Sequence, residues 1–434
     1  MPARREKFSY SQNVEPSVDG ELPPIESDAM DTSRTLHCLA FVFLTSSALT
    51  VTGCDLIKKL KGDKDQGDTT TSGEGPTGKP TAGCELPDTV KADVTVKKGC
   101  AVVLKHNVEV REGATLRIEP GVKISVEQNS YIWVVDGKLV AKGTEKEPIL
   151  LTSANKTTAP GDWVGIVLED KTQAGTELDW VRIEYAGGAS GGGKGAITIL
   201  DQSSPKRISI TNVTIVSSGQ AAVVNEGEKG GFAKFEKNTF KKNKSSLEGH
   251  ARVLGTVGAG NVFSDTLVAA GDVKESTTWP AFDAPVQVKD HFEIGGEKTP
   301  ATLTIAPKTI LKMNGGAYIT IGELNGGSLV ANGVTFTSAN GTPHPGDWVG
   351  LIVYERASTV QLDGAVIEYA GAEASTGKAA ITFYNIDAKK VRGAKLTNVT
   401  FRHNANAAMY SPDHDCSPFA ANKSEGAPLC RPAD

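Results

Sequence analysis

A long stretch of this chain is written twice. The segment Gly161-Asp-Trp-Val-Gly-Ile166 returns as Gly346-Asp-Trp-Val-Gly-Leu351, and Ile183-Glu-Tyr-Ala-Gly187 returns unchanged as Ile367-Glu-Tyr-Ala-Gly371. The two motifs keep almost the same separation in both copies, so they belong to one duplicated unit rather than to two chance matches. A repeat of this length predicts two halves with one architecture, which we place at about 88–270 and 271–408.

The composition favours strands over helices. The chain has 434 residues with 47 glycines and only 6% aromatic residues, and its apolar content is rich in Val and Ile. Such a composition suits an all-β chain with frequent turns. The formal net charge of −5 provides no basic surface of the kind that binds nucleic acid, so we expect no nucleic-acid partner.

The hydrophobic pattern has the period of strands. Leu116, Ile118, Ile124 and Val126 alternate with polar residues on either side of Pro120-Gly121, as two half-buried strands joined by a turn do. Similar strand–turn fragments recur every two to three dozen residues, with no sustained helical period. Each recurrence is long enough for one coil of three short strands that pair in parallel with the next coil.

The predicted fold is therefore all-β, a right-handed parallel β-helix of about ten to twelve coils, because crossovers between parallel strands are almost always right-handed. A β-propeller is the structural alternative, although its blades recur at a longer and more regular period. We assign residues 84–434 to the β-helix, including a C-terminal cap closed by a disulfide.

Five segments of the first copy together resemble a known family. They are Leu116-Arg-Ile-Glu-Pro-Gly-Val122, Gly137-Lys-Leu-Val-Ala-Lys-Gly143, Pro148-Ile149 and the two duplicated motifs. This succession is similar to the bacterial right-handed β-helix repeat proteins of the pectin-lyase-like superfamily, over nearly all of residues 88–406. The resemblance implies the β-helix fold. It also brings in enzymes that use clustered aspartates, often with calcium, to cleave acidic polysaccharides.

The N-terminal part has the features of a bacterial lipoprotein. An apolar run of about thirteen residues, 39–51, is too short to span a bilayer but has the length of a signal-peptide core. Val51-Thr-Gly-Cys54 resembles the lipobox, in which the cysteine receives the lipid. We predict a signal peptide at 30–53, a lipidated Cys54, and a flexible linker at 54–83. Residues 1–29 are either a disordered lead or a mis-assigned start.

Four further cysteines form two close pairs in sequence, Cys84 with Cys100 and Cys416 with Cys430. Each pair would close a short loop at one end of the folded region. The spacing predicts two disulfides in an oxidising compartment.

Eight residues of the duplicated motifs are candidates for glycan binding or for a structural role: Asp162, Trp163, Glu184, Tyr185, Asp347, Trp348, Glu368 and Tyr369. Paired carboxylates are what glycoside cleavage requires. A residue present in both copies more often answers a need of the coil, such as a bond to turn backbone. Tryptophan can stack on sugars or cover the core. We assign no catalytic residue.

Recurring asparagines predict a second structural device. Asn212, Asn238, Asn261 and Asn398 each open a strand, and we interpret them as one internal ladder of stacked amides. The histidines lack zinc-ligand spacing, so we assign no metal site. Calcium bound by Asp413 and Asp415 is the single cofactor alternative left open.

The sequence therefore predicts a monomeric protein of the bacterial cell envelope, held through lipid on Cys54 at the outer membrane or cell surface rather than the inner membrane. We interpret its function as non-catalytic, in adhesion or in binding glycans or surface proteins. The alternative is a polysaccharide lyase or glycoside hydrolase acting on acidic polysaccharide, an interpretation that rests on fold analogy alone.

Overall fold

Short parallel strands make up almost all of the described chain. The computed structural model describes residues 84–200, 208–296, 298–391 and 393–432. The predicted lead, signal peptide, lipidated Cys54 and linker, residues 1–83, lie outside the described residues. Within the described ranges, no helix is long and apolar enough to cross a membrane.

The strands form where the sequence alternates. In β5 (Thr115–Ile118) and β6 (Lys123–Val126), every second side chain is buried and the intervening ones face outward. The turn between them contains Gly121 with φ 76°, a left-handed conformation that glycine adopts without steric cost. Parallel pairing with the coils above and below then satisfies the backbone of each strand.

Five parallel sheets contain these strands. The 14-stranded sheet holds β1 (Thr89–Val90), β4 (Val108–Val110), β7 (Tyr131–Val134), β10 (Gly165–Leu168), β13 (Gly195–Ile199), β16 (Ala221–Asn225), β19 (Ser245–His250), β21 (Leu267–Ala270), β23 (Val286–Val288), β26 (Ile310–Met313), β29 (Thr335–Ser338), β32 (Val366–Glu368), β35 (Thr400–Arg402) and β37 (Lys423–Glu425). The six-stranded sheet holds β2 (Val94–Val96), β5, β8 (Lys138–Lys142), β11 (Thr176–Asp179), β14 (Ile208–Thr211) and β17 (Phe232–Glu236).

Three further sheets contain the remaining strands. The seven-stranded sheet holds β3 (Ala101–Leu104), β6, β9 (Ile149–Ser153), β12 (Val181–Glu184), β15 (Thr214–Val216), β18 (Thr239–Lys241) and β20 (Val262–Phe263). One five-stranded sheet holds β22 (Thr277–Trp279), β25 (Ala301–Ile305), β28 (Gly327–Val330), β31 (Ala357–Asp363) and β34 (Ala394–Thr397). The other holds β24 (Phe292–Ile294), β27 (Tyr318–Ile321), β30 (Gly350–Val353), β33 (Ile381–Phe383) and β36 (Met409–Tyr410). The helical turns are α1 (Ala251–Leu254), η1 (Ala388–Lys390) and η2 (Ser417–Phe419).

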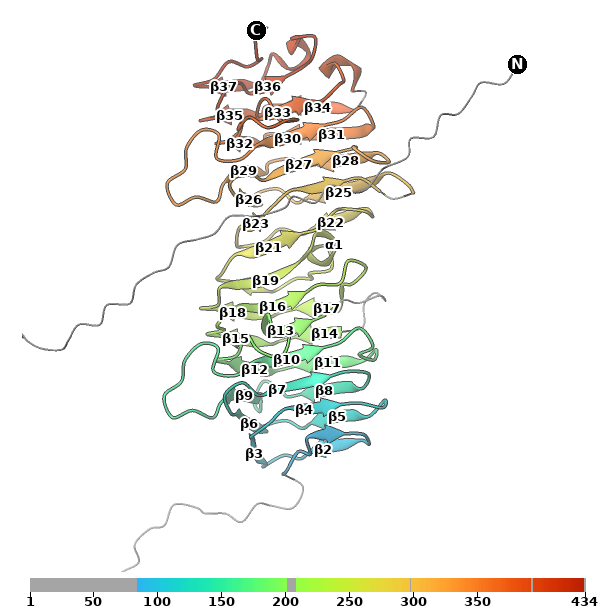
Figure 1. The fold of residues 1–434 in the computed structure, drawn as a ribbon, viewed down its shortest axis with the longest axis vertical. Coiled ribbons are helices and arrows are strands. Elements are labelled where there is room, and N and C mark those ends of the chain that lie inside the picture. Colours follow the sequence, from blue (N-terminus) through green and yellow to red (C-terminus); the bar gives the residue numbers. More distant parts are fainter. Residues whose placement is uncertain (1–83, 201–207, 297, 392, 433–434) are drawn as a thin grey trace, which may run out of the picture. The chain divides into compact units, whose positions relative to one another are not determined.

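The stacked coils have three faces, which Figure 1 shows as three columns of labels. Face 1 runs from β1 to β21 and continues as β24 to β36. Face 2 consists of the six-stranded sheet, α1 and the sheet that begins with β22. Face 3 consists of the seven-stranded sheet and then β23 to β37. The eleven strands of face 2, with α1 between them, agree with the predicted ten to twelve coils.

The 14-stranded sheet changes face at the middle of the structure. Phe263 at the end of β20 contacts the ring of Phe282 and donates its N–H to Asp283, so the segment leading into β23 lies next to the seven-stranded sheet. Val273, just after β21, forms a parallel bridge with Ile294 of β24. The sheet therefore passes from face 1 to face 3 between β21 and β23.

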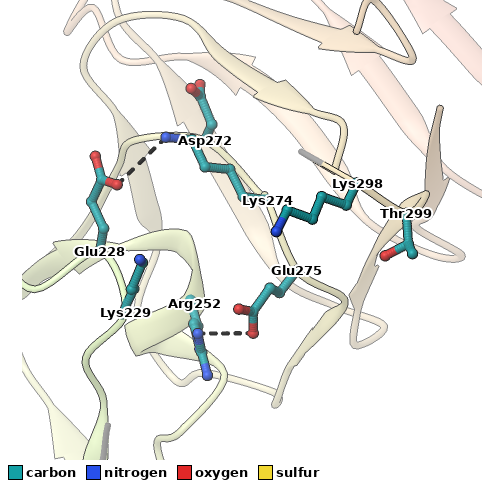
Figure 2. A pocket seen from close by; sticks show the side chains of 8 residues that line it. All are labelled: Glu228, Lys229, Arg252, Asp272, Lys274, Glu275, Lys298 and Thr299. Carbon is teal, nitrogen blue, oxygen red and sulfur yellow. Dashed lines mark hydrogen bonds and ion pairs between the residues drawn. The ribbon is translucent and has the colours of Figure 1, made fainter. Parts of the chain in front are cut away.

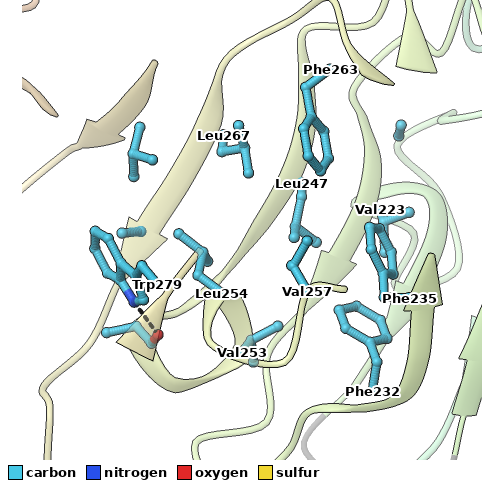
Figure 3. Packing of buried hydrophobic residues seen from close by; sticks show 14 of the residues in the cluster. Val223, Phe232, Phe235, Leu247, Val253, Leu254, Val257, Phe263, Leu267 and Trp279 are labelled. Atoms are coloured by element: carbon cyan, nitrogen blue, oxygen red, sulfur yellow. Dashed lines mark hydrogen bonds between the residues drawn. The ribbon is translucent and has the colours of Figure 1, made fainter. Parts of the chain in front are cut away.

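Helix α1 marks this junction, and the core runs past it without a break. Ala251, Val253 and Leu254 of the helix are buried, and Figure 3 shows Val253 and Leu254 among the core side chains that link the two halves. Trp279 donates its indole N–H to the carbonyl oxygen of Ala251 at 2.6 Å. That bond ties β22 to the helix and satisfies both polar groups inside the core.

Both copies of the duplicated motifs lie on the same side of the coils. The equivalent strands β10 and β30 lie on face 1, β11 and β31 on face 2, and β12 and β32 on face 3. Figure 1 shows the long loops before β10 and before β30 projecting from the same edge. Equivalent strands of the two copies therefore lie on the same face, although the 14-stranded sheet changes face between them.

The two predicted disulfides are confirmed. Cys84 is bonded to Cys100 and Cys416 to Cys430, across sequence separations of 16 and 14 residues. The first bond holds the segment before β1 against the first coil. The second closes a loop beside the last strands, where η2 packs Phe419 against Phe383.

Each disulfide is expected to stabilise the end of the β-helix that it closes. Loops of this length correspond to about 3 kcal/mol of lost chain entropy in the unfolded state. Replacing Cys416 and Cys430 by serine should lower the unfolding free energy by about that amount, and chemical denaturation of the double variant measures it. An unchanged denaturation midpoint would contradict the prediction.

Candidate functional site

The duplicated tryptophans are core residues in both copies. Trp163 and Trp348 each have 0% exposure. Trp163 donates its indole N–H to the carbonyl oxygen of Glu184 at 2.8 Å, and Trp348 does the same to Glu368 at 2.9 Å. Each ring therefore joins the loop before a face 1 strand to the end of a face 3 strand. Neither ring is accessible for stacking on a sugar. Burial therefore supports the structural role of these tryptophans and not the glycan-binding role.

The duplicated aspartates bond to the backbone of their own turns. Asp162 accepts the N–H of Ala159 at 2.9 Å, and Asp347 accepts that of His344 at 3.0 Å. Asp347 also accepts the hydroxyl of Ser338 at 2.6 Å. Burial opposes ionisation of Asp347, but the hydrogen bonds from Ser338, His344 and Asn340 outweigh it and lower the pKa of its carboxyl group.

The duplicated glutamates are held by a threonine and an arginine. Glu184 accepts the Thr152 hydroxyl at 3.2 Å and the Arg182 Nε–H at 2.6 Å. Glu368 accepts the equivalent Thr337 hydroxyl at 2.8 Å, but its arginine is Arg402 from the next coil. The arginine thus comes from a different position in each copy while the interaction is kept. Both carboxylates face outward on face 3, away from any described pocket.

The duplicated tyrosines form the turn that leads from face 3 to the following loop. Tyr185 and Tyr369 have φ values of 59° and 61°, in the left-handed region. Tyr369 stacks on His403 of the next coil at 5.3 Å between ring centroids. The side chains are half-buried at an edge of the coil.

The two copies do not form one site. Seven inter-strand steps separate β10 from β30 along face 1, which at 4.7–4.9 Å a step is about 34 Å. The carboxylates of one copy therefore cannot act together with those of the other copy on one bond, as an acid and base pair must.

The predicted single asparagine ladder is wrong in its register. Asn238 and Asn261 do stack, with a side-chain hydrogen bond of 3.0 Å, and Asn238 caps the N–H of Val213. Asn212 and Asn398 lie one position earlier, at left-handed φ values, and donate to Asp179 and Asp363 instead. The shared Asn-before-strand pattern concealed this one-residue difference.

A second asparagine position was missed from the sequence. Asn243 caps the N–H of Ser218 and donates to Asp265, and Asn404 caps the N–H of Ala370 in the second copy. These residues occupy the turn after the face 3 strand rather than the turn before it. They follow β18 and β35 at a constant distance, which is the signal that could have identified them.

Half-exposed aromatic side chains on the described strands all lie on face 1. They are Tyr131 and Trp133 of β7, Tyr318 of β27 and Tyr410 of β36. Tyr354 and Tyr384, directly after β30 and β33, form a further pair with ring centroids 5.0 Å apart. The aromatic residues of the strands on faces 2 and 3 are buried in the described structure.

Polar groups surround the rings on face 1. Trp133 donates its indole N–H to Glu169 at 2.9 Å, and the guanidinium of Arg111, paired with Glu109, lies 5.4 Å from the Trp133 ring. Burial, with the negative charge of Glu323 as a smaller cause, raises the pKa of Tyr354 to about 12. Rings edged by carboxylates are the type of surface on which sugars stack and donate hydroxyl hydrogen bonds. In the sequence, the alternation Tyr-Ile-Trp-Val of β7 is the pattern that could have indicated this aromatic surface.

A charged pocket lies beside α1, away from the duplicated motifs. It has a volume of about 400 Å³ and is lined by Glu228, Lys229, Arg252, Asp272, Lys274, Glu275, Lys298 and Thr299. Figure 2 shows the Lys298 side chain pointing toward the other lining residues, which form the ion pairs Arg252–Glu275 at 2.8 Å and Lys274–Glu228 at 3.4 Å. These ion pairs neutralise most of the charge of the side chains that line the pocket. The pocket could admit a small charged group, but it contains none of the residues selected from the sequence.

The acidic pair near the C-terminus already has a cation of its own. The ammonium group of Lys389 lies 2.8 Å from Asp413 and 3.8 Å from Asp415. Hydrogen bonds from Lys389 and Ser411 hold the pKa of Asp413 far below its usual range. A calcium ion between these carboxylates would have to displace the lysine. Across the described ranges, no group of three His, Cys, Asp or Glu side chains is arranged to hold a metal ion.

Substitution of the duplicated aspartates is expected to be mildly destabilising, and more so in the second copy. Asp162→Ala removes one hydrogen bond to an exposed N–H, for about 1 kcal/mol. Asp347→Ala also removes the acceptor of Ser338, so its effect should be larger. Because the pKa of Asp347 is lowered in the folded state, its contribution is present above about pH 4 and is lost as pH falls further. Denaturation of both variants at pH 7 and pH 2 checks this; an equal Asp347→Ala deficit at both pH values would contradict it.

One comparison with known proteins gives a match. Residues 88–194 match the family model described as a pectate-lyase-like beta helix domain, a range that contains Asp162, Trp163, Glu184 and Tyr185. No curated protein matches the chain. No solved structure matches it either. The matched range, together with the parallel coils that continue beyond it, supports a pectin-lyase-like right-handed parallel β-helix.

Proposed function

We propose that this β-helix is a non-catalytic glycan-binding protein of the bacterial cell envelope, anchored through lipid on Cys54 and acting as a monomer. The observation that carries the proposal is the restriction of half-exposed strand aromatics to face 1. Aromatic rings give a large contact area at low entropic cost, and neighbouring carboxylates can accept sugar hydroxyl groups. A surface of this kind along one side of a rod suits binding rather than cleavage.

The duplicated carboxylates support the same choice. Asp162 and Asp347 bond to turn backbone, and Glu184 and Glu368 pair with arginine on face 3. Equivalent carboxylates have similar kinds of partner in the two copies, which lie about 34 Å apart. An enzyme needs one constellation around one bond. Cleavage of acidic polysaccharide, the alternative function, therefore has no described cluster of residues in its favour.

Trp133→Ala is the variant that tests this function. Loss of one stacking ring is worth about 1.4 kcal/mol, so affinity for a bound glycan should fall about tenfold. The full chain in detergent is applied to a glycan array, with lyase and reducing-sugar assays run on the same glycans. Binding without cleavage, weakened by Trp133→Ala, is the expected result. Absence of binding to any glycan, or cleavage by the wild-type chain, would overturn the proposal.

A further inference from the structure

The charged pocket beside α1 is separate from the duplicated motifs and from the half-exposed rings of face 1. Its volume of about 400 Å³ is within the range of small-molecule sites. Such sites are mostly apolar, whereas seven charged side chains and Thr299 line this one. An apolar ligand would leave these charges without water, so the pocket suits a small charged molecule.

Residues from both halves of the duplication form this pocket. Glu228 and Lys229 belong to the loop between β16 and β17, in the first half. Lys298 and Thr299 belong to the loop between β24 and β25, in the second half. Arg252 of α1 completes this part of the lining. The pocket therefore lies at the junction where the 14-stranded sheet changes face, and a ligand bound there would contact both halves.

Four of the charged side chains that line the pocket form two ion pairs. Arg252 pairs with Glu275 at 2.8 Å, and Lys274 pairs with Glu228 at 3.4 Å. Because these four charges cancel, they do not decide whether the pocket prefers a cation or an anion. The preference depends on the charged groups that remain.

The remaining groups are one carboxylate and two ammonium groups. Asp272 accepts the backbone N–H of Glu293 at 3.0 Å, and Figure 2 shows its carboxylate pointing away from the other lining side chains. Lys229 and Lys298 form no ion pair with any residue that the structure describes. In Figure 2, Lys229 lies on the left of the pocket and Lys298 on the right. The pocket therefore has two ammonium groups available to an anion.

From this lining we infer that the pocket binds a soluble phosphate monoester, whose phosphate group is held by Lys229 and Lys298. A phosphate monoester carries about two negative charges at neutral pH, one for each of these ammonium groups. Lysine binds phosphate as a point charge, and its flexible stem lets the ammonium group move to the ligand. The hydroxyl group of Thr299, next to Lys298, can donate a further hydrogen bond to a phosphate oxygen.

Calorimetry of the full chain in detergent tests this site, with glycerol phosphate as the probe. Low ionic strength is required because salt screens exposed charges. One binding site per chain is expected, since both lysines belong to one pocket. Lys229→Met and Lys298→Met each remove one ammonium group and keep an unbranched side chain. Each should lower the affinity about tenfold, the usual loss for one hydrogen bond between charged groups.

A matched control is Lys395→Met. Lys395 is an exposed lysine on β34 of face 2, outside the pocket, and it forms no ion pair with a described residue. This variant should bind glycerol phosphate like the wild type. An equal loss of affinity in Lys395→Met would show that the anion binds to lysines without preference, and would overturn the inference.

Two further measurements test the class of ligand and the contact with both halves. Dimethyl phosphate, a diester with the single charge of a lipid headgroup, should bind about tenfold more weakly than glycerol phosphate. Equal binding of the diester would overturn the monoester and favour a lipid headgroup. Glycerol phosphate should also slow hydrogen exchange in both loops, the one with Lys229 and the one with Lys298. Protection of one loop alone, or no saturable binding of glycerol phosphate, would overturn the inference.

Discussion

Trp163→Ala and Trp348→Ala are each expected to lower the free energy of unfolding by about 3–5 kcal/mol, the usual result of truncating a large buried side chain. Both indoles have 0% exposure and are among the largest buried side chains of the described core. Removal also leaves the carbonyl oxygen of Glu184 or Glu368 without the indole donor. Because each coil contacts only its neighbours, a loss at one coil is not made good elsewhere.

Two controls separate the core role from a ligand role. Trp163→Phe keeps most of the volume and removes the hydrogen bond, so it should cost much less than alanine. Trp133→Ala, on the outer side of face 1, should change stability by under about 1 kcal/mol while it weakens glycan binding. Denaturation with two spectroscopic probes measures all four variants. A Trp163→Ala or Trp348→Ala protein with wild-type stability would show that these rings do not hold the coils together.

The fold could be predicted because the local pattern and the repeat agree. Alternation around Pro120-Gly121 identifies strands, and the duplication fixes that the second half folds like the first. The disulfides followed from cysteine spacing at the two ends of the β-helix. In each case the deciding interactions are close in sequence or repeat at a constant interval.

What could not be predicted depends on register between coils. Asn212 and Asn238 precede similar strands, yet one lies a single position before the other, and only the pairing of Thr214 with Thr239 reveals the difference. The change of face between β21 and β23 likewise occurs next to the coil that contains α1, which has no counterpart in the duplicated motifs. A one-residue shift moves a side chain to a different position in the ladder, and no local propensity specifies it.

The candidate surface was missed because identity between copies drew attention to the wrong aromatics. Trp163 and Trp348 are conserved between the halves because both close the same part of the core. Trp133 has no tryptophan counterpart, since the equivalent residue in register is Thr320. Residues that differ between two copies of one scaffold are better candidates for ligand contact than residues that the scaffold needs twice.

The membrane anchor is the part of the proposed function whose removal should abolish a measurable property completely. Val51-Thr-Gly-Cys54 and the apolar run before it lie outside the described residues, so the prediction rests on the sequence. A single acyl chain gives only marginal membrane binding, whereas two or more hold a protein stably. A lipidated Cys54 should therefore keep the whole chain in the membrane fraction.

Cys54→Ala should reduce incorporation of labelled fatty acid to background and leave the signal peptide uncleaved at this position. It should also change the share of the chain that is found in the membrane fraction. Cys38→Ala is the matched control, because Cys38 lies within the predicted signal peptide that would be removed before the mature protein forms. That variant should be labelled and cleaved like the wild type. Metabolic labelling and mass spectrometry of the mature N-terminus measure both outcomes. Equal labelling of Cys54→Ala and the wild type would place the anchor elsewhere, and a mature chain that begins away from position 54 would replace the lipoprotein assignment with an ordinary secretory one.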